Sequence, residues 1–222
     1  MKVAVLIDGG HLRVQARKAN HAYNPDFIEK VAHSCVDARE TLLRVLYYDC
    51  PPFNGEVRLP VSGKTTEFKG SDHWLRELAA KDLFAVRRGV LKFRGYKPKK
   101  IPVADNELTD DDFKPDFEQK GVDMRIGLDM ANFAADRTVD RIVLVTGDTD
   151  CVPAMKNCRI RGLQVVLVAL ADHKPPPELL WHSDIHRTVN WPADGQIAEN
   201  SAADVTSASS TTRHRWRQSN SR

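Results

Sequence analysis

The 222 residues include 41% hydrophobic and 28% charged side chains, which is enough apolar material for a folded core under a solvated surface. The formal net charge is +3, too small to indicate a nucleic-acid or membrane partner by itself. No apolar run approaches the roughly 18 residues that a bilayer-spanning helix needs. These features exclude a transmembrane protein and favour one α/β domain with ordinary additions.

The N-terminus and the cysteines bear on the compartment. The first apolar run is about five residues long and Asp8 ends it, whereas a signal peptide needs roughly seven to fifteen. The four cysteines contain no CxxC pair, which argues against a zinc site and for free thiols in a reducing compartment. We therefore expect a cytoplasmic protein without a membrane partner; the sequence leaves its oligomeric state open.

The first half of the chain alternates strand and helix patterns. Residues 3–7 (VAVLI) form a continuous apolar run, typical of a strand buried on both faces. Asn24 and Pro25 predict a helix start with Asn24 as the N-cap, and we expect this helix to run to about residue 38. Residues 41–48 (TLLRVLYY) predict the second strand.

The middle of the chain is less regular. Residues 51–70 contain prolines and glycines and predict a loop or an insertion. Residues 71–82 predict a helix and residues 84–93 a strand. Residues 122–135 have apolar side chains at helical spacing, which is a strong helix signal. The remaining runs predict strands at 142–145, 164–170 and 185–189 and helices at 152–161 and 177–181.

The chain ends in a segment of different composition. From residue 193 to residue 222 it is rich in Ser, Thr, Ala and Asn with almost no large apolar side chain, so it cannot offset its ordering entropy by burial. We predict one domain over residues 1–191 and a disordered tail over 192–222. The final RHRWRQSNSR is basic with one Trp, and it fits either a solvated tail or a contact with nucleic acid.

Charge is unevenly distributed in the middle of the chain. Residues 87–100 hold seven Lys or Arg and no acid, and residues 103–118 hold seven Asp or Glu against Lys114. These runs fit a solvated hairpin and an acidic loop, or a phosphate-binding edge beside a repelling or regulatory loop. In the second interpretation Phe93 and Tyr96 are available for base stacking. The nucleic-acid-binding candidates are Arg87, Arg88, Lys92, Arg94, Lys97, Lys99 and Lys100.

Four aspartates lie where predicted strands end or helices begin. Asp8 follows the first strand directly, Asp148 and Asp150 follow the strand at 142–145 in the turn TGDTD, and Asp123 lies in the first turn of a helix. Functional groups of parallel α/β sheets collect at the carboxyl edge of the strands. Four carboxylates at one edge repel one another unless a cation lies among them. Oxygen ligands without His or Cys suit Mg²⁺ or Mn²⁺.

Each aspartate also has a purely structural explanation. Asp150 fits the N-cap of the helix at 152–161, Asp123 fits a favourable charge at a helix N-terminus, and Asp8 fits a tight turn with Gly9 and Gly10. Asp148 is explained least well in this way, because a turn needs only one such residue. Turns alone do not account for all four acids following successive core elements.

Three segments resemble the NYN domain family of PIN-like nucleases. They are VAVLIDGGHL, KGVDMRIGLDMANFA and IVLVTGDTDCVPAMKNCRIRGLQVVLV, in the family's order. The resemblance implies a Rossmann-like, three-layer α/β domain with a mainly parallel sheet, and a divalent-metal cluster that hydrolyses phosphodiesters, usually of RNA. The implied metal-binding and catalytic residues are Asp8, Asp123, Asp148 and Asp150, with Thr146 and Gly147 shaping the last turn.

His11 and Asp129 lie near the four aspartates in the sequence but have a less certain relation to the metal cluster. His11 stands where many family members have Asn, which puts in doubt a water- or substrate-orienting role there but not the metal cluster. Asp129 lies six residues after Asp123, about 120° away around a helix, so we expect it and Asn132 to be structural or to support the ligands.

The expected function is hydrolysis of RNA, or of another nucleic acid, by a metal-activated water. One alternative is a HAD-type phosphatase, which needs a second Asp two residues after the first; that position is Gly10. The other is a non-catalytic module that binds RNA or a protein on the same fold. Cleavage assays separate these alternatives.

Overall fold

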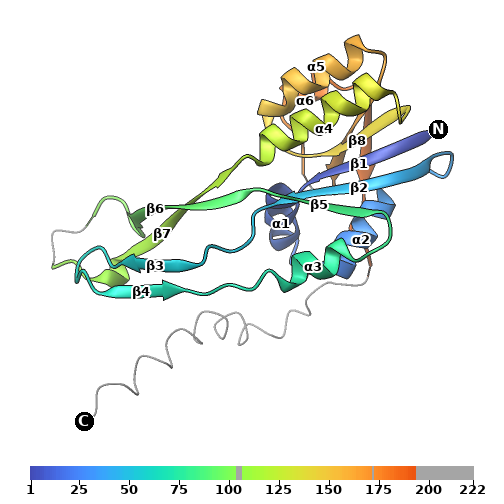
Figure 1. The fold of residues 1–222 in the computed structure, drawn as a ribbon. Helices are drawn as coiled ribbons and strands as arrows, with labels where there is room; N and C mark the ends of the chain where they lie inside the picture. The colour runs from blue at the N-terminus through green and yellow to red at the C-terminus, as the bar shows by residue number, and fades with distance from the viewer. Residues whose placement is uncertain (104–106, 172, 194–222) are drawn as a thin grey trace.

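A six-stranded parallel sheet forms the centre of the protein (Figure 1). The structure is a computed structural model that describes residues 1–103, 107–171 and 173–193. The α/β class with a mainly parallel sheet is confirmed, whereas the predicted tail lies almost entirely outside the described residues. In spatial order the strands are β10 (Ile185–Val189), β9 (Gln164–Leu170), β8 (Arg141–Val145), β1 (Lys2–Asp8), β2 (Thr41–Asp49) and β5 (Phe84–Arg88).

Helices cover both faces of the sheet and give three layers (Figure 1). Alternate side chains of β1 point to opposite faces, so Val3, Val5 and Ile7 join one core cluster and Ala4 and Leu6 the other. All five are fully buried, which is why this strand is a continuous apolar run. One face carries α1 (Gly9–Lys18), α2 (Pro25–Ser34) and α3 (His73–Ala79), and the other α4 (Val122–Asp136), α5 (Val152–Ile160) and α6 (Pro177–Trp181).

The predicted start of α2 is confirmed, but its predicted end is wrong. The Asn24 side chain accepts a hydrogen bond from the Phe27 amide at 2.8 Å, as expected of an N-cap. The helix ends at Ser34 and not near residue 38. Beyond it the Asp37 amide donates to the Glu40 carboxylate at 2.7 Å, which draws the chain into a turn.

Two glycines mark places where the sequence prediction failed. Gly9 does not form a tight turn but opens α1, a helix that the sequence analysis missed. A Cβ there would lie 2.4 Å from the Tyr47 hydroxyl, so close packing requires glycine at this position. The strand expected at 84–93 is broken at Gly89, where a Cβ would lie 2.8 Å from Cys50 Sγ. The chain leaves the central sheet at this residue.

Two antiparallel hairpins extend from the carboxyl edge of the sheet (Figure 1). The segment predicted as a loop at 51–70 contains one hairpin, and the acidic segment supplies a strand of the other. We call these strands the arm: β3 (Gly55–Arg58), β4 (Thr65–Phe68), β6 (Val90–Pro98) and β7 (Phe113–Lys120).

An aromatic cluster joins the two hairpins of the arm. Ring centroids lie 5.3–6.3 Å apart among Phe53, Phe68, Phe93, Tyr96 and Phe117. Such contacts stabilise small sheets such as these hairpins. Phe93 and Tyr96, the candidates for base stacking, both belong to this cluster and are half-buried, so their role in stacking stays a prediction.

The cysteines and the helices agree with the compositional expectations. All four cysteines are free and buried. Burial raises the pKa of Cys35 and Cys151 to about 12 and that of Cys158 to about 11, so these thiols stay protonated at neutral pH. Among the residues that the structure describes, no helix combines the length and the apolar character that a membrane span requires.

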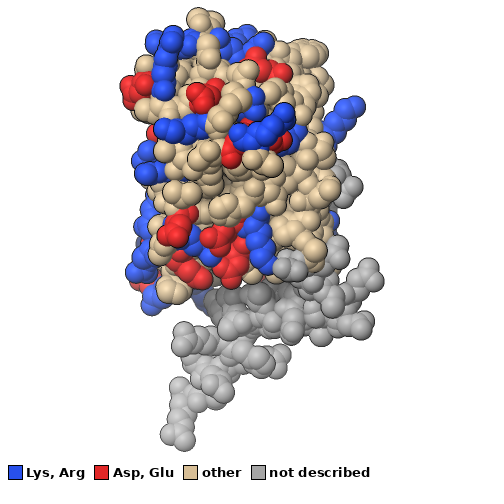
Figure 2. Space-filling model, turned by 90° about the vertical axis from the view of Figure 1, so that its right-hand side faces the viewer, with Lys and Arg blue, Asp and Glu red and all other residues tan. Residues whose placement is uncertain are grey.

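A buried ion-pair network holds the amino ends of the strands together. The Glu40 side chain is 1% exposed and accepts hydrogen bonds from Arg141 of β8 at 2.5 Å and from Arg187 of β10 at 2.9 Å. Burial alone raises the pKa of Glu40, but the bonds from Arg187, the Asp37 amide and Arg141 outweigh it and hold the pKa at about 2. Figure 2 looks onto this end of the molecule, where cations and acids are interspersed on the visible described surface.

We expect Glu40→Gln to lower the free energy of unfolding at pH 7 by about 3 kcal/mol, because two arginines lose their buried counter-charge. The carboxyl pKa is about 2 in the folded protein against an ordinary 4.5, so Glu40 stabilises the fold above pH 4.5 and this contribution is lost as pH falls toward 2. Urea unfolding between pH 7 and pH 3 checks both points. Glu77→Gln, at an exposed position on α3, is the control; equal losses for the two variants would contradict the network.

Candidate active site

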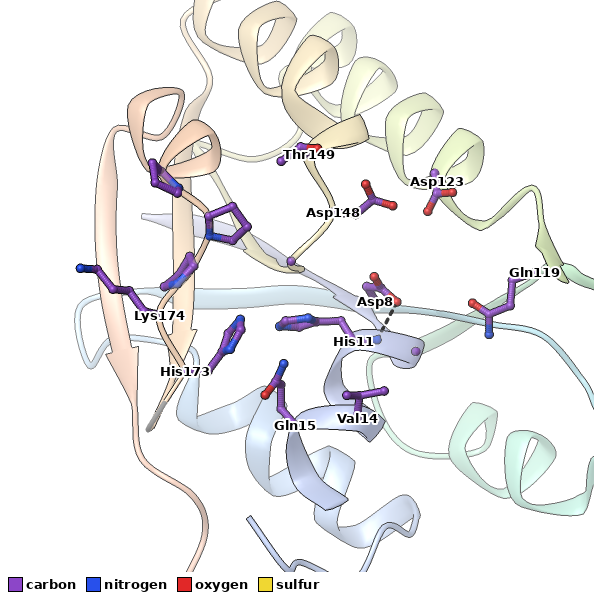
Figure 3. Close-up of a pocket in the computed structure, with 15 residues that line it drawn as sticks. Asp8, His11, Val14, Gln15, Gln119, Asp123, Asp148, Thr149, His173 and Lys174 are labelled. Atoms are coloured by element: carbon purple, nitrogen blue, oxygen red, sulfur yellow. Dashed lines mark hydrogen bonds between the residues drawn. The ribbon is translucent and has the colours of Figure 1, made fainter. Parts of the chain in front are cut away.

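An open pocket of about 890 Å³ lies at the carboxyl edge of the sheet (Figure 3). It lies over β1 and β8. The chain passes from β1 to β2 on one side, whereas β8 adjoins β1 on the other side, so the strand order reverses between β1 and β8. Ligands of open α/β sheets bind at such a reversal. Asp8, Asp123 and Asp148 all line it. Three of the four predicted acids thus share one pocket although they come from three separate parts of the chain.

Asp8 ends β1 and caps α1. Its carboxylate accepts hydrogen bonds from the His11 amide at 3.1 Å and from the Thr146 hydroxyl at 3.2 Å. Burial has the largest effect on this carboxyl and raises its pKa. The two hydrogen bonds lower the pKa, and the nearby charge of Asp123 raises it further. Ionised Asp8 is therefore held in place by donors, and no Lys or Arg of the described residues forms a salt bridge with it.

The turn after β8 positions the second acid. The buried Thr146 hydroxyl donates to Asp8 and accepts from the Asp148 amide at 3.1 Å, so one side chain links the two acidic segments. Asp148 Oδ1 in turn accepts from the Asp150 amide at 2.9 Å. Asp148 thus caps the 3-10 turn at Thr149–Cys151, and the N-cap of α5 is Cys151 and not Asp150.

Asp123 and Asp150 complete the acidic group in different ways. Asp123 lies in the first turn of α4, and burial together with the charges of Asp148 and Asp150 raises its pKa. Asp150 is exposed and does not line the pocket. Across the described ranges, no group of three His, Cys, Asp or Glu side chains is arranged to hold a metal ion. Asp8, Asp123 and Asp148 thus line one pocket, and the charges of neighbouring acids raise the pKa of Asp8 and Asp123. Their side chains are not arranged as the ligands of a bound ion.

Asp129 has a structural role, as its helical position suggested. It accepts a hydrogen bond from the Tyr48 hydroxyl at 2.9 Å and two from Arg87 at 3.0 and 3.2 Å. These contacts tie α4 to β2 and β5. Arg87, a predicted nucleic-acid contact, is thus already engaged inside the domain.

The sequence analysis missed Asp49, the acid at the end of β2. It follows a buried strand as Asp8 does, and that position was the available signal. Asp49 is fully buried and is bound by the Arg13 guanidinium, by the Tyr47 hydroxyl at 3.0 Å and by the Cys50 amide at 2.7 Å. Asp49 does not line the pocket. Arg13 neutralises its charge within the core.

Two histidines on the other side of the pocket pack against each other. The rings of His11 and His173 meet edge to face with centroids 5.1 Å apart. Burial, with smaller effects of His173 and Lys18, lowers the pKa of His11 to about 4, so its ring is neutral at pH 7. A Cβ on Gly147 would lie 2.7 Å from the His11 ring, so the glycine predicted to shape the last turn also makes room for it.

In the arm, acids of the segment 103–118 neutralise part of the basic segment 87–100. Pairing of β6 with β7 brings Arg94 to Glu118 and Lys97 to Asp116, each at 2.5 Å. Arg88 likewise pairs with Asp72 at 2.9 Å. The basic segment is thus balanced in three dimensions to an extent that its sequence does not show. Within the described ranges, three of its cations form no salt bridge: Lys92, Lys99 and Lys100.

The comparison with family models decides the family. The model of the NYN domain matches residues 2–187, from β1 into β10. The chain belongs to the NYN domain family. This family is nuclease-like and of the PIN-like type, so the suspected resemblance is confirmed and the acidic pocket lies in a nuclease-type fold.

Two further comparisons add little to this assignment. No curated protein matches the chain. A crystal structure of a protein of unknown function from Vibrio parahaemolyticus RIMD 2210633 is similar, with 18% sequence identity and a TM-score of 0.48. The similarity covers 88% of this chain and 96% of that one.

We expect Asp8→Asn to raise the melting temperature of the metal-free NYN domain at pH 7 by roughly 2–4 °C. Asn keeps an acceptor for the His11 amide but removes a charge whose ionisation opposes folding. Because the folded pKa is raised above 3.8, the gain is full above the folded pKa and vanishes below pH 3.8.

The measurement is a set of melting curves in EDTA from pH 7 to pH 3.5. Asp82→Asn, at an exposed position before β5, is the control and should leave the curve unchanged. A lower melting temperature for Asp8→Asn at pH 7 would mean that the cap matters more than the repulsion.

Proposed function

We propose that this protein is a divalent-metal-dependent ribonuclease that hydrolyses phosphodiester bonds at the pocket of Asp8, Asp123 and Asp148. One observation carries the proposal. Three carboxylates from three elements face one open pocket, two of them have raised pKa values, and no Lys or Arg of the described chain is paired with them. Such an arrangement opposes folding unless a cation binds there.

The donor chemistry fits Mg²⁺ or Mn²⁺. The pocket offers carboxylate oxygens and the acidic side has no thiolate, which suits a hard cation. Asp8, Asp123 and Asp148 would hold the ion, with Asp150 supporting from the same turn. When bound, the metal supplies Lewis acidity toward a phosphoryl oxygen and lowers the pKa of water.

The chain's own residues orient and admit the substrate. Thr146 keeps Asp8 and Asp148 at a constant separation through its two hydrogen bonds. Asp148 is braced by the Asp150 amide, so its free oxygen faces the pocket in a defined direction. The pocket is open to solvent, which lets a polymer enter without the movement of a lid.

The arm supplies the features that favour a nucleic acid. It rises from the same edge of the sheet as the pocket (Figure 1) and exposes Lys92, Lys99 and Lys100, which form no salt bridge among the described residues. Phosphates attract such side chains over distances of a Debye length. We assign the substrate to RNA because it is the usual substrate of the family that the motifs resemble.

A second candidate is a non-catalytic module that binds RNA on the same fold. The observation in its favour is that the acids form no ready ligand group in the described part of the chain. Incubation of RNA with the protein in Mg²⁺, Mn²⁺ or EDTA separates the two: metal-dependent cleavage supports the nuclease, and binding without cleavage in all three supports the module.

We expect Asp148→Asn to reduce metal-dependent RNA cleavage by at least about 100-fold while the protein stays folded. Asn keeps the oxygen that accepts from the Asp150 amide, so the turn is preserved, but the charge that a cation needs is lost. Paired cleavage assays and melting curves check this. The control is Asp129→Asn, which should alter stability through Tyr48 and Arg87 more than cleavage. A folded Asp148→Asn protein that cleaves like the parent would remove Asp148 from the site.

We expect replacement of Lys92 and Lys99 by Ala to weaken RNA binding and to flatten its salt dependence by about 1.4 in the log–log slope, or ~0.7 for each contact. Neither lysine has a salt bridge in the described chain, so the fold should be unaffected. Binding titrations at several salt concentrations measure the slope. Lys2→Ala with Lys156→Ala is the control, since it removes the same charge away from the arm; equal effects of both pairs would reduce the arm to a solvated surface.

A further inference from the structure

The pocket has a second wall, opposite Asp123 and Asp148, that carries hydrogen-bond donors (Figure 3). We call it the donor wall: His11 and Gln15 from α1, and His173 and Lys174 from the segment after β9. Val14 and the prolines at 175–177 border it with apolar surface. Asp8 lies next to His11, between the donor wall and the other two acids.

Gln15 is the most telling member of the donor wall. Its side chain is only 8% exposed, lines the pocket and makes no hydrogen bond within the described chain. In Figure 3 its amide points toward His11 and His173. The Gln15 amide is thus free to form hydrogen bonds with a ligand that enters the pocket.

His173 and Lys174 continue the wall, and Figure 3 shows the Lys174 side chain directed away from Gln15 and from the acids. The His173 ring packs edge-on against His11, and its Nε2 is buried without a partner among the described residues. Lys174 is exposed at the pocket and forms no salt bridge in the described ranges. Among the described residues of this wall, an amide, two imidazoles and an ammonium group suit an anion with several acceptor oxygens.

We propose that the donor wall is a phosphate subsite, which holds the phosphate next to the bond to be cleaved. This inference rests on the proposed nuclease function, since it places a second phosphate of the same strand in the pocket of the acids. Val14 and the prolines then lie beside the sugar or base attached to that phosphate. An internal phosphodiester and a 5′-terminal phosphate present the same oxygens, so both are sources of the ligand group.

The test measures binding without cleavage. In EDTA, fluorescence anisotropy is recorded for a short RNA with a 5′-phosphate and for the same RNA with a 5′-hydroxyl. We expect Lys174→Ala and Gln15→Met each to weaken binding about tenfold, because each removes a donor to a charged oxygen. Lys156→Ala, an exposed lysine on α5 outside the pocket, should bind like the parent, and Lys174→Arg should retain most of the affinity.

Each outcome has a defined meaning. A loss confined to the 5′-phosphorylated RNA assigns the subsite to a terminal phosphate, and an equal loss for both RNAs assigns it to an internal one. Parental affinity of Lys174→Ala for both RNAs overturns the proposal even if Gln15→Met fails to fold, because Lys174 is exposed. An active parent should also show a raised KM with little change in kcat for Lys174→Ala. Absence of cleavage by the parent would instead refute the nuclease function and leave these binding results to be judged separately.

Discussion

Parallel strands all end at one edge of their sheet, and here three neighbouring strands end in or next to an aspartate: Asp49 on β2, Asp8 on β1 and Asp148 after β8. Carboxylates that gather at one edge of a sheet repel one another, and the structure treats them in two ways. Arg13 neutralises Asp49 inside the core. Asp8 and Asp148 receive hydrogen bonds but form no salt bridge within the described residues, so this part of the edge is the candidate site and the part at Asp49 is structural.

Much of this arrangement could be predicted from the sequence because it depends on local patterns. The continuous run in β1 and the position of Asp8 after it follow from burial on both faces of a parallel sheet. The positions of Asp123 and Asp148 follow from a helix start and a strand end. Local patterns cannot show which acid is neutralised, because Arg13 reaches Asp49 from 36 residues away in the chain.

The failures of the sequence analysis share a cause in tertiary packing. Gly9 and Gly10 resemble a turn, but the contact with Tyr47 that makes glycine necessary exists only after β1 and β2 have paired. The charge runs on either side of residue 101 look like separate basic and acidic surfaces. Antiparallel pairing of β6 and β7 places them opposite each other, and two of the salt bridges follow from that register. The donor wall was missed because α1 and the segment after β9 meet only in the folded chain.

A few consecutive residues of one backbone segment join the arm to the pocket. The charges of the arm therefore have a fixed position relative to the acids, which a separate basic patch would lack. Strand β7 passes Gln119, which lines the pocket and contacts Asp49 at 3.4 Å, and then turns at Gly121 with a φ of 76° into α4. Glycine adopts this φ without strain, and the Arg125 side chain binds the Gly121 carbonyl at 2.7 Å and closes the turn. Asp123 lies two residues beyond. If RNA binds along the arm as proposed, it lies at a set distance from the acids, because only a few ordered residues of one backbone separate the cationic surface from Asp123.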